Sequence, residues 1–298
     1  MNGHSKHIAV AVALAGAATI GIAARPVAGI APLDQAAVAQ APRTVQADWP
    51  QVDLPTIDVL DAALTQPHLI DNAVADVLVR LAGSVCSGTP ITGTVYVVTA
   101  AHCVFTKSGE LTQRTVVRDH HRYPAVAVLV DTDYFEHPSE ELDAAVLVLA
   151  EVLPGPSARV GLALPDSGQV TLAGFQPLDS DGSLLRGGGP NDHQVAKDAS
   201  GTPVALPYEP AGCVESARSL EVSGARVMVP CGLVPGASGG GLYTEDHGEL
   251  VLVGILSTVT SDLTANGIVP LASLQKLLDH PDRYGNGFTA RHVHREQP

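Results

Sequence analysis

Three short stretches of the chain contain residue types that together could carry out nucleophilic catalysis. Ser238 lies among glycines in the sequence GASGGG, residues 236–241. His102 follows the small and apolar residues VVTAA, and Asp143 begins the run DAAVLVL. A serine hydroxyl becomes a nucleophile when a neutral histidine accepts its proton and a buried carboxylate orients that histidine. The three residues therefore predict acyl-transfer chemistry.

The surroundings of each residue are compatible with that chemistry, and the presence of all three together favours it over the plain structural alternatives. Glycines around Ser238 allow a tight turn that exposes the hydroxyl and leaves backbone N–H groups free to hold an oxyanion. The residues after Asp143 must be buried, so its carboxylate lies at the edge of the core and needs a partner. Taken singly, the same motifs also fit a flexible glycine–serine loop, a packed histidine and a solvated acid.

The elements that must position these residues are short strands. From Val77 onward, apolar runs rich in valine alternate with Gly, Pro, Asp or Ser, and such punctuation predicts an all-β barrel or sandwich. The runs are VLVRLAG, TVYVVTAA, PAVAVLV, AAVLVLA, QVTLAGF, ARVMVP and ELVLVGIL. Near the end of the chain, LASLQKLL at residues 271–278 has apolar residues at helical spacing and predicts a C-terminal helix.

The order His102, Asp143, Ser238, within the motifs TAAHC, DAAVL and GASGG, resembles the trypsin/chymotrypsin-like serine protease family, in its secreted bacterial branch. The same order differs from that of α/β-hydrolases and subtilisins. The resemblance implies an all-β fold of two six-stranded antiparallel β-barrels with a C-terminal helix. His102 and Asp143 then belong to a first barrel at about 77–150, and Ser238 belongs to a second barrel at about 168–278.

The resemblance also assigns further roles. The backbone N–H groups of Gly236 and Ser238 form the oxyanion hole. Ser257 lies near Asp143, on the strand along which the substrate backbone pairs, and Gly232 lies at the base of the primary specificity pocket. Gly232 replaces the aspartate of trypsins, and Leu256 stands where glutamate-cleaving relatives carry histidine. We therefore expect a small or medium apolar substrate side chain in that pocket.

Four cysteines allow two disulfide bridges, a metal site or free thiols. No CxxC spacing occurs, which disfavours zinc. The resemblance implies the bridges Cys86–Cys103, beside the histidine, and Cys213–Cys231, ahead of the nucleophile. Each bridge would stabilise the fold by about 3 kcal/mol in the chain-entropy description. We expect no metal and no cofactor.

One position departs from the pattern of the animal members of the family. They carry an aspartate before the nucleophile, and it pairs with an amino terminus that proteolysis releases; this chain has Ala237 there. Activation by an inserted amino terminus is therefore not expected. We expect Cys231 to help hold the loop of Ser238 in its place.

The amino-terminal region predicts export. Lys6 precedes an uncharged stretch at residues 8–24, followed by small residues, which is the pattern of a signal peptide over residues 1–31. A retained membrane anchor is the alternative, although the stretch is short for a span of about 20 apolar residues. Residues 32–70 are rich in Ala, Pro, Gln and Asp and predict a linker or pro-segment before a peptidase domain at residues 71–298.

Composition excludes several other functions. Acidic residues outnumber basic ones 31 to 17, and the formal net charge is −14, so nothing indicates binding to nucleic acid.

The sequence predicts a monomeric, secreted or envelope-associated serine endopeptidase that acts on peptides or proteins and contacts a membrane only through a retained anchor. The alternatives are a catalytically silent pseudoprotease that binds a partner, and an enzyme active on esters alone.

Overall fold

The computed structural model describes the part of the chain that contains the predicted catalytic residues. All of these residues belong to one unit, residues 42–298. The predicted signal peptide and nearly all of the predicted linker lie outside the described residues, so their boundaries stay predictions. The described residues are 66–82, 86–106, 109–111, 115–137, 139–178, 183–184, 196–197, 203–204, 207–223, 226–234, 236–260, 264–275 and 288–292.

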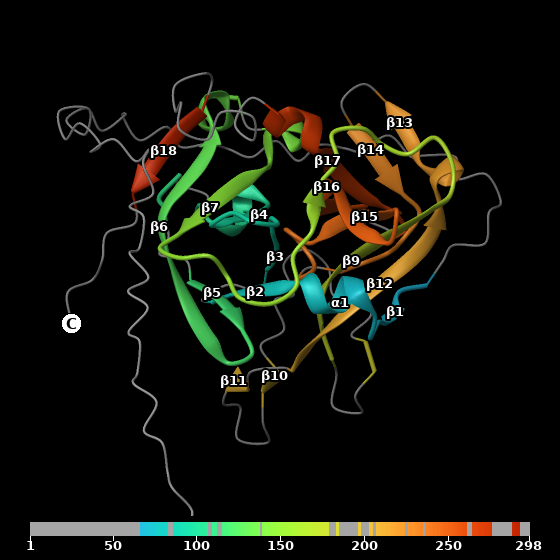
Figure 1. Ribbon diagram of the computed structural model, residues 1–298, viewed down its shortest axis with the longest axis horizontal. Helices are drawn as coiled ribbons and strands as arrows, with labels where there is room; N and C mark the ends of the chain where they lie inside the picture. The colour runs from blue at the N-terminus through green and yellow to red at the C-terminus, as the bar shows by residue number, and fades with distance from the viewer. Residues whose placement is uncertain are drawn as a thin grey trace, which may run out of the picture. The chain divides into compact units, whose positions relative to one another are not determined.

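Six strands close the first barrel, in the order β2-β3-β4-β7-β6-β5 and back to β2. Their bounds are β2 Val79–Ala82, β3 Ser87–Pro90, β4 Tyr96–Thr99, β5 Thr115–Arg118, β6 His121–Asp131 and β7 Ala145–Leu149. Every neighbouring pair is antiparallel. A further strand from the end of the chain, β18 (Phe288–His292), pairs with β6 and lies outside this ring (Figure 1).

The second barrel is built from the strand order β12-β9-β15-β16-β17-β14. The bounds are β9 Gln169–Pro177, β12 Tyr208–Ser216, β14 Arg226–Val229, β15 Gly241–Asp246, β16 Glu249–Val259 and β17 Asn266–Pro270. In the described residues β12 and β14 share no backbone ladder, and the disulfide Cys213–Cys231 links the two ends of this open ring instead. The short strands β1 (His68–Leu69), β8 (Arg159–Val160) and β13 (Glu221–Ser223) pair with β12, β16 and β14.

Alternating burial explains why these residues form strands. In β2, Val79 and Leu81 are buried and Arg80 is exposed, so one face of the strand lines the core. Mostly aliphatic side chains fill both barrels, in a chain of which only 4% of the residues are aromatic. The prediction of an all-β, chymotrypsin-like fold is confirmed.

Helical segments are few and short in the described residues. The α-helix α1 (Ala73–Val77) has five residues, and 3₁₀ turns make up the rest. The turns are Ala101–Cys103, Thr132–Phe135, Glu140–Leu142, Ala217–Ser219 and Leu271–Leu274. The predicted C-terminal helix begins as the last of these turns, and residues 276–278 lie outside the described part. No helix in the described residues is long and apolar enough to cross a membrane.

The segment that enters the first barrel is fixed by a buried arginine. Arg118, at the end of β5, is only 7% exposed. Its guanidinium donates to the backbone carbonyls of Val77 (2.7 Å), Asp76 (3.3 Å) and Pro154 (3.0 Å). Arg118 thus joins α1 to the loop that leaves the first barrel. Because hydrogen bonds from a charged donor are strong, and buried carbonyls without a donor are costly, we expect this contact to matter for stability.

Substituting Arg118→Met is expected to lower the free energy of unfolding by about 3 kcal/mol, because it removes three charge-assisted hydrogen bonds from a buried site. Arg159→Met is the matched control. The exposed Arg159 pairs with Asp246 and Glu249, and such surface pairs contribute about 0–1 kcal/mol. Urea unfolding of both variants checks the difference; equal losses would contradict the role given to Arg118.

Candidate active site

His102 is placed by the end of a buried strand. After β4 the chain turns through the 3₁₀ segment Ala101–Cys103, in which Ala101 and Cys103 are buried and His102 faces outward. The disulfide Cys86–Cys103 ties this turn to the start of β3. The second bridge, Cys213–Cys231, is also present, so both disulfides implied by the family resemblance occur in the structure. Small residues and a covalent bridge therefore fix the backbone that carries the imidazole.

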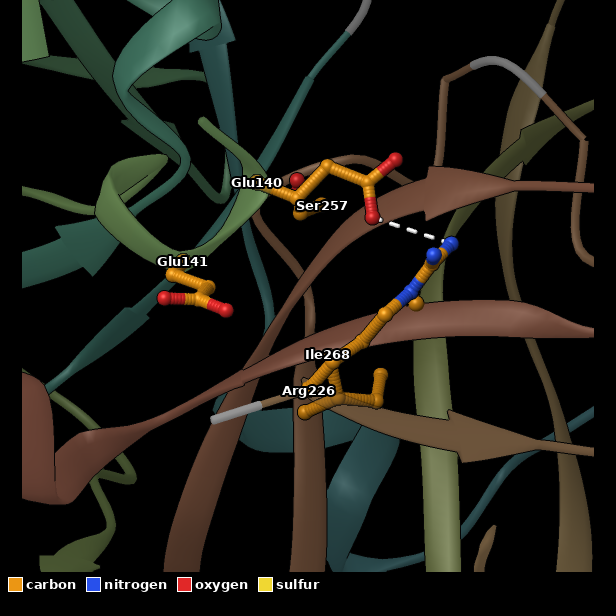
Figure 2. Close-up of a pocket in the computed structure, with 6 residues that line it drawn as sticks. Glu140, Glu141, Arg226, Ser257 and Ile268 are labelled. Carbon is orange, nitrogen blue, oxygen red and sulfur yellow. Dashed lines mark ion pairs between the residues drawn. The ribbon is translucent and has the colours of Figure 1, made fainter. Parts of the chain in front are cut away.

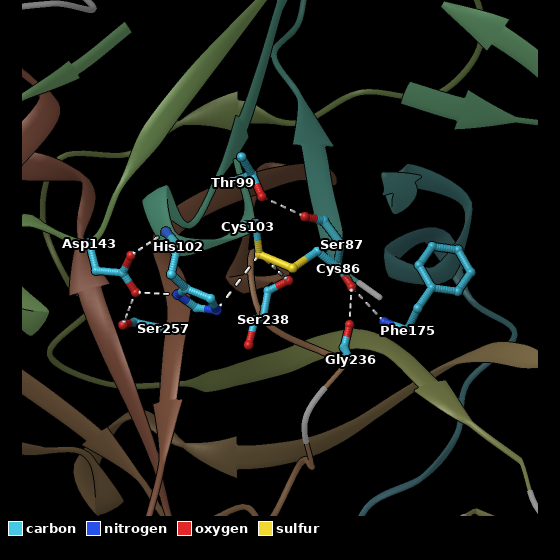
Figure 3. Close-up of a disulfide and its surroundings, with 10 residues drawn as sticks. All are labelled: Cys86, Ser87, Thr99, His102, Cys103, Asp143, Phe175, Gly236, Ser238 and Ser257. Carbon is cyan, nitrogen blue, oxygen red and sulfur yellow. Dashed lines mark hydrogen bonds and ion pairs between the residues drawn. A yellow bond between two sulfur atoms is a disulfide. The ribbon is translucent and has the colours of Figure 1, made fainter. Parts of the chain in front are cut away.

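Asp143 lies in the short gap between a 3₁₀ turn and β7, with 9% of its side chain exposed. Figure 3 shows three of the hydrogen bonds that its carboxylate accepts. The donors are the backbone N–H of His102 (2.8 Å), its ring Nδ1 (2.7 Å) and the hydroxyl of Ser257 (2.5 Å). The buried carboxylate thus has the partners that its position requires. The structure brings His102, Asp143 and Ser257 together from different parts of the chain.

The contact with Asp143 decides the tautomer and the proton affinity of His102. A carboxylate only accepts hydrogen bonds when ionised, so Nδ1 carries the proton and Nε2 is left as an acceptor. Burial lowers the pKa of the imidazole, but the charge of Asp143 and the hydrogen bond to it outweigh burial and raise the pKa above its usual value of 6.5. The ring keeps 38% of its side-chain surface exposed, so Nε2 remains reachable.

Ser238 lies beside this pair (Figure 3). Cys103 Sγ is 3.6 Å from the Ser238 carbonyl oxygen and 3.8 Å from His102 Nε2. These are packing contacts, because a disulfide sulfur carries no hydrogen. Within the described site, the Ser238 hydroxyl and His102 Nε2 form no hydrogen bond. Catalytic hydrogen bonds are often long or poorly aligned in proteins without substrate, so this geometry is compatible with proton transfer after binding.

Two amide groups in the Ser238 loop are available to a ligand. The other amides of the loop donate to backbone carbonyls: Ala237 to Val234, Gly239 to Leu256, and Gly240 to Ala237. Within the described residues, the amides of Gly236 and Ser238 have no acceptor. Gly236 has a φ of 121°, which glycine adopts without strain. The loop therefore offers two N–H donors close to the Ser238 side chain.

Two residues near the site gave no signal in the sequence. Tyr134 is 1% exposed, and burial, together with the neighbouring Asp143, raises the pKa of its phenol. Ser87 is fully buried and contacts the Ser238 loop. Tyr134 lies in a stretch of acidic residues and Ser87 follows a cysteine, so only their three-dimensional neighbours show that they belong here.

A small pocket adjoins the site behind Ser257 (Figure 2). Arg226 and Glu140 form an ion pair across it at 2.9 Å, and both side chains are about three-quarters buried. Its volume of about 10 Å³ has room for roughly one water molecule. The lining residues are Glu140, Glu141, Arg226, Ser257, Gly267 and Ile268. The pocket is too small for a substrate side chain, and Gly232 does not line it.

One group of side chains has the composition of a metal site. Ligand atoms of Cys86, Cys103 and His102 lie within 4.8 Å of one another. The two sulfurs are bonded to each other, however, and a metal binds the thiolate form of cysteine. This group therefore does not fit a metal ion.

Comparison with known protein families matches residues 86–255 to the trypsin-like peptidase domain. The chain belongs to this family. It is a serine-type peptidase, a hydrolase whose fold implies peptide or protein substrates. A search of curated proteins found no match to the chain.

The solved structures to which this chain is similar include those of three proteases. The structure of a Glu endopeptidase matches this peptidase with a TM-score of 0.51 and 16% identity, over 72% of this chain and 96% of that chain. The thermostable serine protease AL20 from an extremophilic microorganism matches with a TM-score of 0.49, 14% identity, and 71% and 99% coverage. The protease Anisep from Arthrobacter nicotinovorans matches with a TM-score of 0.45, 16% identity, and 65% and 87% coverage.

The contact between His102 and Asp143 generates a prediction that does not depend on activity. We expect the pKa of His102, measured by NMR titration, to lie above 6.5 in the wild type and to fall in Asp143→Asn, because burial of the ring then acts without the compensating charge. Asp246→Asn, which removes an exposed carboxylate elsewhere, is the control and should leave the titration of His102 unchanged. An unaltered His102 pKa in Asp143→Asn would contradict the assigned coupling.

Proposed function

We propose that this peptidase is an exported serine endopeptidase that uses Ser238, His102 and Asp143 to form and hydrolyse an acyl-enzyme. The observation that carries the proposal is the hydrogen bonding of the buried Asp143. The carboxylate fixes the tautomer of His102 and leaves Nε2 as an acceptor beside Ser238. Activation of a serine hydroxyl requires a histidine that is oriented in this way.

The proposed reaction follows from the positions of these groups. Ser238 Oγ attacks the peptide carbonyl carbon while His102 Nε2 accepts the hydroxyl proton. The negative charge that develops on the carbonyl oxygen is stabilised by the amides of Gly236 and Ser238. The protonated His102 then donates to the leaving amine, and Asp143 stabilises the imidazolium meanwhile. Water, deprotonated by His102, hydrolyses the acyl-enzyme and regenerates Ser238.

The raised pKa of His102 is compatible with this role. An imidazole with a raised pKa is a better proton acceptor than an unperturbed histidine. Activity should therefore fall on the acid side as His102 is protonated.

We also propose a substrate preference and a cellular compartment for this peptidase. Gly232 and Leu256 offer no charge to the primary pocket, so we propose cleavage after a small or medium apolar side chain. This preference differs from the one in the name of the structurally similar Glu endopeptidase. Two disulfides support an oxidising compartment, and with the amino-terminal sequence they favour a secreted, bacterial-type enzyme.

A fluorophosphonate probe tests the proposal directly. We expect the purified protein to be labelled at one residue per chain, and we expect Ser238→Ala and His102→Ala to lose labelling while both variants remain folded by circular dichroism. Ser273→Ala, which changes an exposed serine far from the loop in sequence, should be labelled like the wild type.

Labelling that persists in Ser238→Ala would contradict the assignment of the nucleophile. Absence of labelling in the wild type, both before and after limited proteolysis of residues 32–70, would instead favour a protein that uses the fold for binding.

A further inference from the structure

Among the residues that the structure describes, no charged side chain anchors the loop that carries Ser238. Ala237 is fully buried. A Cβ atom on the neighbouring Gly174 would lie 2.5 Å from the Ala237 carbonyl oxygen, so the backbone of β9 packs directly against the loop. This close approach fixes one side of the loop by shape alone. Packing without directional bonds does not determine how the peptide planes are oriented.

Ser87 supplies directional bonds from the other barrel. It begins β3, directly after Cys86, and is fully buried. Its hydroxyl donates to the Gly236 carbonyl oxygen (3.3 Å) and accepts from the Phe175 amide (2.8 Å), while its own amide donates to the Ser238 carbonyl oxygen (2.8 Å). Figure 3 shows Ser87 between Phe175 and the Ser238 loop. One residue of the first barrel thus holds two carbonyls of the loop.

Ser87 is itself held in place. The hydroxyl of Thr99, a fully buried residue at the end of β4, donates to the Ser87 carbonyl oxygen at 2.7 Å. The loop approaches both residues closely, because a Cβ on Gly239 would lie 2.2 Å from Thr99 Oγ1 and 2.3 Å from the carbonyl oxygen of Ser87. Gly239 also has a φ of 79°. Only glycine allows this approach, so Ser87 and the loop form one packed unit.

The two carbonyls that Ser87 binds belong to particular peptide planes. One plane joins Gly236 to Ala237, and the other joins Ser238 to Gly239. Between them lies the plane that joins Ala237 to Ser238 and carries the Ser238 N–H. Because the planes on both sides are anchored, the intervening N–H has a fixed direction. Gly236 has no Cβ to restrict rotation, so its plane depends on the bond from Ser87.

We propose that the Ser87 hydroxyl is a positioning element for the oxyanion hole, in place of an ion pair at position 237. This rests on the proposed function, in which the Gly236 and Ser238 amides bind the oxyanion. The hydroxyl acts through the loop backbone and does not touch the substrate. In this buried site the Ser87 hydroxyl donates one hydrogen bond and accepts another. Deleting the hydroxyl therefore leaves the Gly236 carbonyl and the Phe175 amide without this partner.

The test compares Ser87→Ala with Thr89→Val. Thr89 lies two residues along the same strand, is 1% exposed, and forms a buried hydrogen bond with the Tyr243 hydroxyl at 2.6 Å instead of with a carbonyl of the loop. Both variants lose one buried hydroxyl, so both lose stability. Only Ser87→Ala is expected to slow fluorophosphonate labelling, by about 10- to 100-fold at a temperature well below either melting point. The reason is that the loss of one oxyanion donor lowers the reaction rate by about that factor or more.

Hydrogen exchange of the loop gives a readout that does not require activity. We expect amides in the peptide covering residues 232–242 to exchange faster in Ser87→Ala than in Thr89→Val. Both variants are measured as full chains, each at the same number of degrees below its own melting temperature. If Ser87→Ala does not fold, Ser87→Cys carries the same comparison, because the thiol keeps nearly the same side-chain volume and is only a weak hydrogen-bond donor.

The outcomes separate this inference from the proposed function. Labelling of the folded Ser87 variant within twofold of wild type, with loop exchange equal to that of Thr89→Val, would overturn the role of Ser87. Faster loop exchange in a protein whose wild type is not labelled would support the positioning role and contradict the proposed peptidase mechanism.

Discussion

The arrangement of the site depends on a single buried carboxylate. Asp143 takes hydrogen bonds from the backbone and ring of His102 in the first barrel and from Ser257 in the second. A buried charge of this kind is stable only while its donors stay in place. The ends of β4 and β16 and the start of β7 must therefore keep their relative positions. The two barrels are held together by the same atoms that orient the imidazole.

The loop of Ser238 adds a second junction between the barrels. The disulfide Cys213–Cys231 fixes the chain before the loop, Gly239 and Gly240 connect it to β16 through backbone hydrogen bonds, and Ser87 binds it from the first barrel. Covalent, steric and hydrogen-bond restraints thus converge on a short turn rich in glycine. Such a turn needs these external restraints, because glycine itself restricts the backbone very little.

The sequence predicted the features that depend on residues close together in the chain. Valine-rich runs predicted the strands, and the motifs around His102, Asp143 and Ser238 indicated residues that the fold brings together. Ser87 could not be predicted in the same way, since its partner Gly236 lies 149 residues away and its hydroxyl matters only once the barrels are docked. The strand β18 was also missed, because FTARH has no strong alternation and its pairing with β6 is a tertiary contact.

In the proposed site, the loop of Ser238 presents two amides to an oxyanion while Ser87 holds the loop from behind. A crystal structure of the full chain inactivated with phenylmethylsulfonyl fluoride would show this geometry. We expect a bond between Ser238 Oγ and sulfur, a sulfonyl oxygen that accepts hydrogen bonds from the Gly236 and Ser238 amides, and the Ser87 hydroxyl still donating to the Gly236 carbonyl. An adduct on another residue, or a sulfonyl oxygen facing solvent with the loop amides turned away, would contradict it.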